Sequence, residues 1–117
     1  MQDFPSIPYF KSDLAATAVL VKGQVLRLET LEAQQKTTAD LWIQLFDARA
    51  AADVTVGTTT PNLSFIIPMS DGTNYTATTK DFPKGVRFVK GLVIAATTTA
   101  TGNGAPASNV IVNLTYF

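Results

Sequence analysis

The sequence contains no His and no Cys, and this removes most side-chain chemistry that enzymes use. Imidazole acid–base catalysis, thiolate nucleophiles, disulfides and Cys/His zinc sites all require one of these residue types. Carboxylate pairs remain possible for a glycosidase, either Glu29 with Glu32 or Asp71 with Asp81. Acidic residues in turns, however, are ordinarily turn formers. We therefore predict that the chain is not an enzyme and has no catalytic residues.

Two loops offer groups that could hold a ligand. The stretch SDGTN, residues 70–74, gathers oxygen atoms but lacks the regular carboxylate spacing of a calcium loop. Its Asp-Gly step favours a hairpin turn instead. The stretch GNGAPAS, residues 102–108, has no Lys-Ser/Thr ending and no helix after it, so it is not a phosphate loop. We expect neither a metal nor a cofactor.

Composition points to contact with other protein chains. The 117 residues fit one domain, and nine basic residues balance nine acidic ones, so we expect neither nucleic acid nor a membrane as partner. Charged residues make up only 15% of the chain, against 46% hydrophobic residues, which is expected when a partner covers part of the surface. The N-terminus does not have the pattern of a signal peptide, and the apolar stretches are too short to span a bilayer.

Alternation of apolar and polar residues predicts that the chain folds from short β-strands. In residues 38–46, Leu41, Ile43 and Leu45 share one face, which is typical of a strand. Residues 24–36 are ambiguous, because their composition favours a helix and their alternation favours a strand. Further strands are expected at residues 62–69, 75–79, 86–89, 92–99 and 110–117, with a short edge strand at 54–56 and turns at 70–74 and 81–85. Seven to nine such strands predict an all-β, antiparallel β-sandwich.

The N-terminal segment differs from the rest of the chain. Pro5 and Pro8 favour an extended arm over residues 1–13, which leaves 14–117 as the β-sandwich domain. The arm carries Phe4, Tyr9 and Phe10, which need cover. It either packs on its own domain or reaches a neighbouring subunit.

Trp42 and Phe46 occupy the face of their strand that should be mostly polar in a single sandwich. Three interpretations stay open: cover from the same chain, a subunit interface, or a platform on which a sugar stacks. Together with the three aromatic residues of the arm, Trp42 and Phe46 are the predicted contact residues.

From Leu41 onward, the order of motifs resembles small structural proteins of tailed bacteriophages. The motifs are LFDA (45–48), VGTTTP (56–61), an apolar strand closed by Pro (63–68), FPKGVRFVKGL (82–92), an Ala/Thr-rich strand (93–99), an AP-containing loop (105–106) and VNLTY (112–116). They span about two-thirds of the chain, and the Phe-Pro-x-Gly stretch is the most specific of them. In such proteins the segment before LFDA is extended, so the resemblance favours a strand over residues 24–33.

The resemblance implies a jelly-roll-like sandwich that assembles on the virion. It implies first a capsid decoration, or cement, protein that forms homotrimers on the major capsid protein after synthesis in the bacterial cytoplasm. The alternative is a fibre, neck, tail or baseplate component that binds a host glycan.

Overall fold

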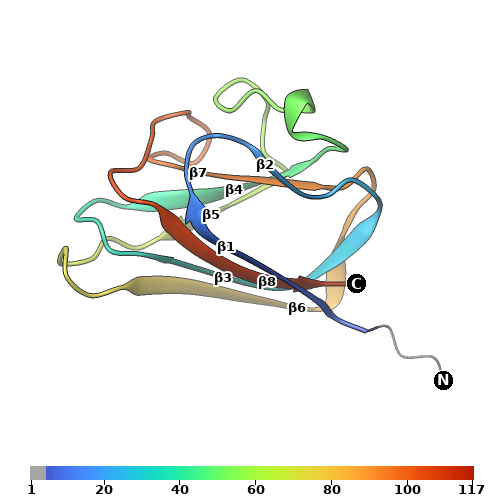
Figure 1. The fold of residues 1–117 in the computed structure, drawn as a ribbon, viewed down its shortest axis with the longest axis horizontal. Coiled ribbons are helices and arrows are strands. Elements are labelled where there is room, and N and C mark those ends of the chain that lie inside the picture. The colour runs from blue at the N-terminus through green and yellow to red at the C-terminus, as the bar shows by residue number, and fades with distance from the viewer. Residues whose placement is uncertain (1–4) are drawn as a thin grey trace.

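A computed structural model describes residues 5–117 as two four-stranded antiparallel β-sheets packed face to face (Figure 1). The strands are β1 (Ile7–Leu14), β2 (Val19–Lys22), β3 (Leu26–Gln35), β4 (Leu41–Asp47), β5 (Leu63–Ile67), β6 (Thr76–Phe88), β7 (Leu92–Thr97) and β8 (Val110–Tyr116). Over this range the only helical element is a 3-10 turn, η1 (Ala51–Asp53). None of the described residues forms a helix long and apolar enough to cross a membrane.

The strand order is that of a jelly roll. The first sheet has the order β1-β8-β3-β6, and the second has the order β2-β7-β4-β5. The first strand therefore pairs with the last, the second with the seventh, the third with the sixth, and the fourth with the fifth. A long antiparallel hairpin that is rolled up in this way gives two Greek keys and two facing sheets. The predicted antiparallel β-sandwich is confirmed.

The core lies between the two sheets, as the alternation of apolar residues requires. Leu28, Leu31 and Leu114 point inward from the first sheet, and Leu41, Ile43 and Ile94 point inward from the second. These six side chains are at most 2% exposed. Their burial is the main source of stability, because each fully buried Leu or Ile contributes roughly 1.5–3 kcal/mol.

The ambiguous segment at residues 24–36 is a strand. β3 pairs with β6 on one side and with β8 on the other, so it is a central strand of its sheet. A shift in register between Leu28 and Thr30 lets both Leu28 and Leu31 face the core. Burial between two neighbouring strands therefore outweighs the helical propensity of this stretch.

One hairpin prediction and one turn prediction are wrong. The SDGTN stretch does not close a hairpin, because β5 and β6 lie in different sheets and the loop crosses from one sheet to the other. Residues 81–85 are not a turn either, because β6 continues through them. Its pairing passes from Asp81 opposite Thr30 to Val86 opposite Leu28, so the intervening residues bulge. β6 is an edge strand, where a Pro such as Pro83 is tolerated.

Two other segments also differ from expectation. Residues 54–56, expected as a short edge strand, belong instead to the loop that contains η1. The extended N-terminal segment was expected over residues 1–13, and residues 7–14 of the chain are the strand β1, hydrogen-bonded to β8. This part of the segment is therefore an edge strand of the sandwich itself.

Candidate functional site

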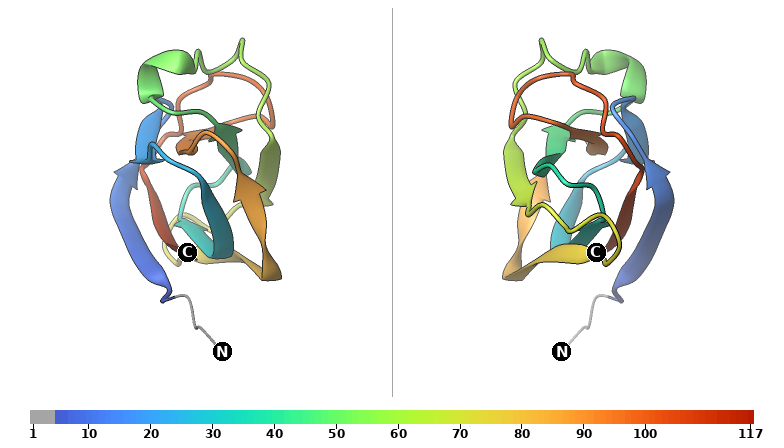
Figure 2. Two further views of the ribbon diagram at one scale, coloured as in Figure 1. Left: turned by 90° about the vertical axis from the view of Figure 1, so that its right-hand side faces the viewer. Right: turned by 90° about the vertical axis from the view of Figure 1, so that its left-hand side faces the viewer.

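Phe46 lies inside its own chain. Its side chain is 1% exposed and packs with Ala48, Val54, Val93 and Ala95 in a second, smaller core on the outer face of the second sheet. The loop 48–61, drawn in green, arches over this face and covers it (Figure 2). Of the three interpretations of Trp42 and Phe46, cover from the same chain is the correct one for Phe46, and the loop 48–61 provides that cover.

Gln44 closes the same face beside Phe46. Its side-chain amide is buried and donates to Thr97 Oγ1 at 2.8 Å, to the Gly102 carbonyl at 3.0 Å and to the Thr99 carbonyl at 3.2 Å. Its carbonyl oxygen Oε1 is buried without a hydrogen-bond partner among the described residues. These bonds fix the β7–β8 loop to β4, so this part of the second sheet is not a free surface.

Trp42 occupies the remaining, partly open part of that outer face. It is half-buried and stands directly opposite the exposed Ile66 of β5. The exposed Met69 and Tyr75 follow in the β5–β6 loop. We call these four residues the β5 surface. Large apolar side chains that gather at one end of a small domain are typical of contact sites.

A second exposed apolar pair lies at the other end of β6. Val25 precedes β3, Val89 follows β6, and both side chains are exposed. Val25 also lines a groove of about 220 Å³ with Leu26, Arg27, Arg87 and Phe117. Arg27 and Arg87 stand opposite each other in the β3–β6 ladder, which places two positive charges side by side. We call the pair Val25 and Val89 the β6–β7 surface.

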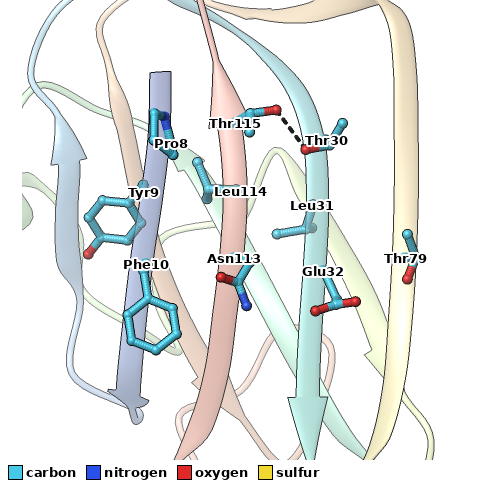
Figure 3. Close-up of a pocket in the computed structure, with 10 residues that line it drawn as sticks. All are labelled: Pro8, Tyr9, Phe10, Thr30, Leu31, Glu32, Thr79, Asn113, Leu114 and Thr115. Carbon is cyan, nitrogen blue, oxygen red and sulfur yellow. Dashed lines mark hydrogen bonds between the residues drawn. The ribbon is translucent and has the colours of Figure 1, made fainter. Parts of the chain in front are cut away.

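The outer face of the first sheet carries a groove of about 300 Å³ (Figure 3). Phe10, Asn113, Glu32 and Thr79 lie at one level of the four strands and line it, and we call them the four-strand row. Phe10 is 62% exposed. At one end of the groove, Thr30 and Thr115 are joined through their hydroxyl groups at 2.6 Å.

The other predicted aromatic contacts divide between described and undescribed residues. Tyr9 is half-buried, packs against the main core, and burial raises the pKa of its hydroxyl group. Phe4 lies outside the described residues. Of the five predicted contact residues, the structure therefore brings Tyr9 and Phe10 to the first sheet and Trp42 and Phe46 to the second.

The four carboxylates considered for catalysis do not form the two pairs that a glycosidase would need, and neither pair lines a common cleft. Glu29 accepts hydrogen bonds from Ser6 at 2.5 Å and from Thr115 at 3.0 Å, and Glu32 accepts one from Gln34 at 2.8 Å. Asp71 organises its own loop, whereas Asp81 is in the middle of β6. No group of three or more potential metal-ligating side chains occurs in the described part of the chain.

No protein-family model matches this chain, and no curated protein matches it either. What can be argued about its function therefore comes from the jelly-roll fold, the β5 surface, the β6–β7 surface and the four-strand row.

Alternation along the strands could have identified the outward side chains of the four-strand row one strand at a time. It could not align them, because the register between strands distant in sequence is not encoded in any one strand. Met69 and Tyr75 lie in the β5–β6 loop, and alternation along strands does not identify which side chains of a loop are exposed.

Proposed function

We propose that this chain is a structural protein of a bacteriophage virion, and specifically a capsid decoration protein that stabilises the head by bridging capsid subunits. The resemblance of residues 41–116 to such proteins motivates the proposal. Its support from geometry is one observation: exposed apolar side chains flank both ends of β6, with Tyr75 before it and Val89 after it.

This placement suits a protein that joins two neighbours. A strand of 13 residues spans about 40 Å at the usual rise per residue, and the molecule measures 47 Å along its longest axis. The β5 surface and the β6–β7 surface are therefore too far apart to be covered by one small contact. Each can bind a different capsid subunit, or one can bind the capsid while the other binds a second copy.

The mechanism is mechanical. A trimer seated across several capsid subunits makes several contacts, each of them weak. Separation of any one capsid subunit then requires several contacts to break together, because the remaining contacts keep the local concentration high. The head thereby resists the pressure of packaged DNA without any chemical step.

Virions that lack the protein provide the test. We expect heads without it to open at lower temperature and after milder osmotic shock than complete heads, as followed by gradient sedimentation. Purified protein added back should restore resistance. A Tyr75→Asp/Val89→Asp variant should fold but fail to restore it, because both apolar surfaces then carry a charge. Thr101→Asp, an exposed substitution in the β7–β8 loop, is the matched control.

Heads that keep full resistance without the protein would contradict the decoration role. Detection of the protein on fibres, neck or tail by immunogold microscopy would instead support the alternative location on the virion. The four-strand row is the observation that favours a glycan-binding role.

A further inference from the structure

We infer that the outer face of the first sheet is a binding site for a neutral saccharide, centred on Phe10, Asn113, Glu32 and Thr79. This inference is independent of the location on the virion, because it concerns the isolated domain.

The site is built by strand register. Phe10 of β1 is opposite Asn113 of β8, Asn113 is opposite Glu32 of β3, and Glu32 is opposite Thr79 of β6. Each strand thus contributes one outward side chain to a straight row across the whole sheet. Three interstrand steps of about 4.8 Å make the row about 14 Å long, enough for a short oligosaccharide. The groove runs beside this row, between it and the neighbouring row of Pro8, Thr115 and Thr30 (Figure 3).

The chemistry of the row matches a sugar ring. Phe10 offers an exposed apolar face of the kind that stacks against ring C–H groups. Beside it, the Asn113 amide can both donate and accept, and the Thr79 hydroxyl can do the same. Neither side chain makes a hydrogen bond within the described residues, so both are available to a ligand. A hydrophobic face with a few convergent polar groups is the usual composition of small-ligand sites.

Glu32 orients the acceptor side of the site. The Gln34 amide donates to Glu32 Oε1 at 2.8 Å, which holds the carboxylate in place. The second oxygen, Oε2, has no hydrogen-bond partner in the described part of the chain and can accept from a sugar hydroxyl. Because Phe10 and Glu32 stand on either side of Asn113, a ring stacked on Phe10 would direct its hydroxyl groups toward the amide and the carboxylate.

The charges select a neutral ligand. Glu32 is the only charged side chain of the row, and it repels phosphates, sulfates and acidic sugars. The nearby basic groups are engaged elsewhere: Lys11 pairs with Asp13 at 3.1 Å, and the Lys80 ammonium lies 5.3 Å from the centre of the Phe65 ring. The groove therefore lacks the cationic groups that anionic ligands require.

A partner strand is a poorer occupant than a saccharide at this place. β1 is an edge strand and could in principle add a strand from another chain. Its edge, however, carries Pro8, the Lys11–Asp13 ion pair and a break in register between Lys11 and Leu14. These are features that protect edges from pairing.

Titration of the purified chain, followed by ¹H–¹⁵N NMR, tests the inference. The probes are maltotriose, cellotriose and triacetylchitotriose, each taken to about 10 mM so that a site with Kd of about 1 mM is saturated. We expect at least one probe to give saturable shifts in β1, β8, β3 and β6 around the four-strand row. A sulfated disaccharide should give none.

Variants separate stacking from general effects. Phe10→Ala should weaken binding at least about fivefold, and Asn113→Ala should weaken it as well. Both residues are exposed, so both variants should fold. Leu20→Ala, which truncates another exposed apolar side chain on β2 of the second sheet, is the matched control and should bind like the original chain.

Three outcomes would overturn the inference: no saturable shift with any probe, shifts that map elsewhere, or binding that survives Phe10→Ala unchanged. Concentration-dependent shifts of the row without sugar would assign the face to a second copy and would also overturn it. The absence of sugar binding would not affect the resistance of heads to heat and osmotic shock, so the two proposals can fail independently.

Discussion

Among the polar residues buried in the sandwich, Gln35 makes the most side-chain hydrogen bonds. Its Nε2 donates to the carbonyls of Ala39, Ile67 and Pro68, at 2.9, 2.8 and 3.0 Å. Its Oε1 accepts from both the backbone N–H and the hydroxyl of Thr37, at 2.9 and 2.6 Å. One side chain thereby connects the β3–β4 turn to the end of β5, beside the β5 surface.

We predict that Gln35→Leu lowers the free energy of unfolding by about 3 kcal/mol, because the buried Ile67 carbonyl and the buried Thr37 N–H lose their only side-chain partner. Urea denaturation followed by circular dichroism measures the change. Gln34→Leu is the matched control, since Gln34 is only half-buried and makes one side-chain bond, to Glu32. Equal losses for the two variants would show that the Gln35 network contributes nothing particular.

Asp71 controls the local structure of the exposed SDGTN loop. The backbone N–H groups of Asn74 and Thr73 donate to its carboxylate at 2.9 and 2.8 Å, and with the Asn74 side chain they lower its pKa to about 2, from an ordinary value of 3.8. Because the folded pKa is the lower one, the loop gains from the ionised form above pH 3.8. The gain disappears as pH falls through about 2.

We therefore predict that the Thr73 and Asn74 amide resonances shift together with a midpoint near pH 2, and not near 4, in an NMR titration. Asp71→Asn should abolish the transition while the rest of the spectrum stays unchanged. A midpoint near the ordinary Asp value would mean that these hydrogen bonds do not favour the charged carboxylate.

At the scale of elements, the step between β6 and β7 depends on Gly91. Its φ is +152°, and a Cβ built there would lie 2.3 Å from the Lys22 carbonyl oxygen and 2.6 Å from the Ala48 carbonyl oxygen. Two neighbouring backbone segments thus pass close to this position. Because backbone atoms cannot rotate away as a flexible side chain can, only Gly fits.

Gly91→Ala should consequently lower the free energy of unfolding by at least about 2 kcal/mol. Gly72→Ala is the control: its φ is +91°, but its Cβ would meet only the Thr38 methyl group at 3.4 Å. It should cost about 1 kcal/mol from backbone conformation alone. Thermal melts of the two variants give the comparison, and a Gly91→Ala chain as stable as Gly72→Ala would argue against close backbone packing at β7.

The loop 48–61 covers Phe46 but leaves Trp42 partly open. Replacing each of the two side chains by Ala should therefore change the stability of the protein by different amounts. Phe46→Ala should lose about 3–5 kcal/mol of stability in the isolated protein, as expected for a buried Phe. Trp42→Ala should lose clearly less, because Trp42 is only half-buried, and its main effect should be on assembly. Chemical denaturation, together with binding to heads, distinguishes the two. Equal stability losses would place Trp42 in the core as well.

At the scale of the whole molecule, the jelly-roll strand order places the β5 surface and the β6–β7 surface at opposite ends of the domain. β6 extends over 13 residues, and its two ends deliver Tyr75 and Val89 to opposite ends of the domain. The first sheet meanwhile presents the four-strand row on a separate face. The fold can thus hold neighbours at its ends while one broad face stays open.

We predict that the purified protein sediments as a trimer, three times the 12.5 kDa of one chain. If the β5 surface forms the subunit contact, Tyr75→Asp should shift the population toward monomer. If the β6–β7 surface forms it, Val89→Asp should do so. Sedimentation equilibrium at several concentrations measures this. A monomer at every concentration would contradict the proposed trimer.

Much of the fold could be predicted from local patterns. Residues 38–46 and 110–117 alternate clearly, and both contain strands, β4 and β8. Predictions of turns failed where the local structure depends on which strands pair with each other. The Asp-Gly step of residues 70–74 resembles a hairpin locally, yet its flanking strands belong to different sheets. Pro83 and Gly85 resemble a turn, yet an edge strand with a bulge accommodates them.

The sequence by itself determined that this is a β-sandwich without His or Cys chemistry, because period-two alternation and composition are properties of the chain alone. Only the tertiary structure decided that Phe46 is core, that β1 belongs to the first sheet, and that Phe10, Asn113, Glu32 and Thr79 share one row. The physical reason is that burial and register depend on residues far apart in the chain. Phe10 and Asn113 become neighbours only when the first and last strands pair.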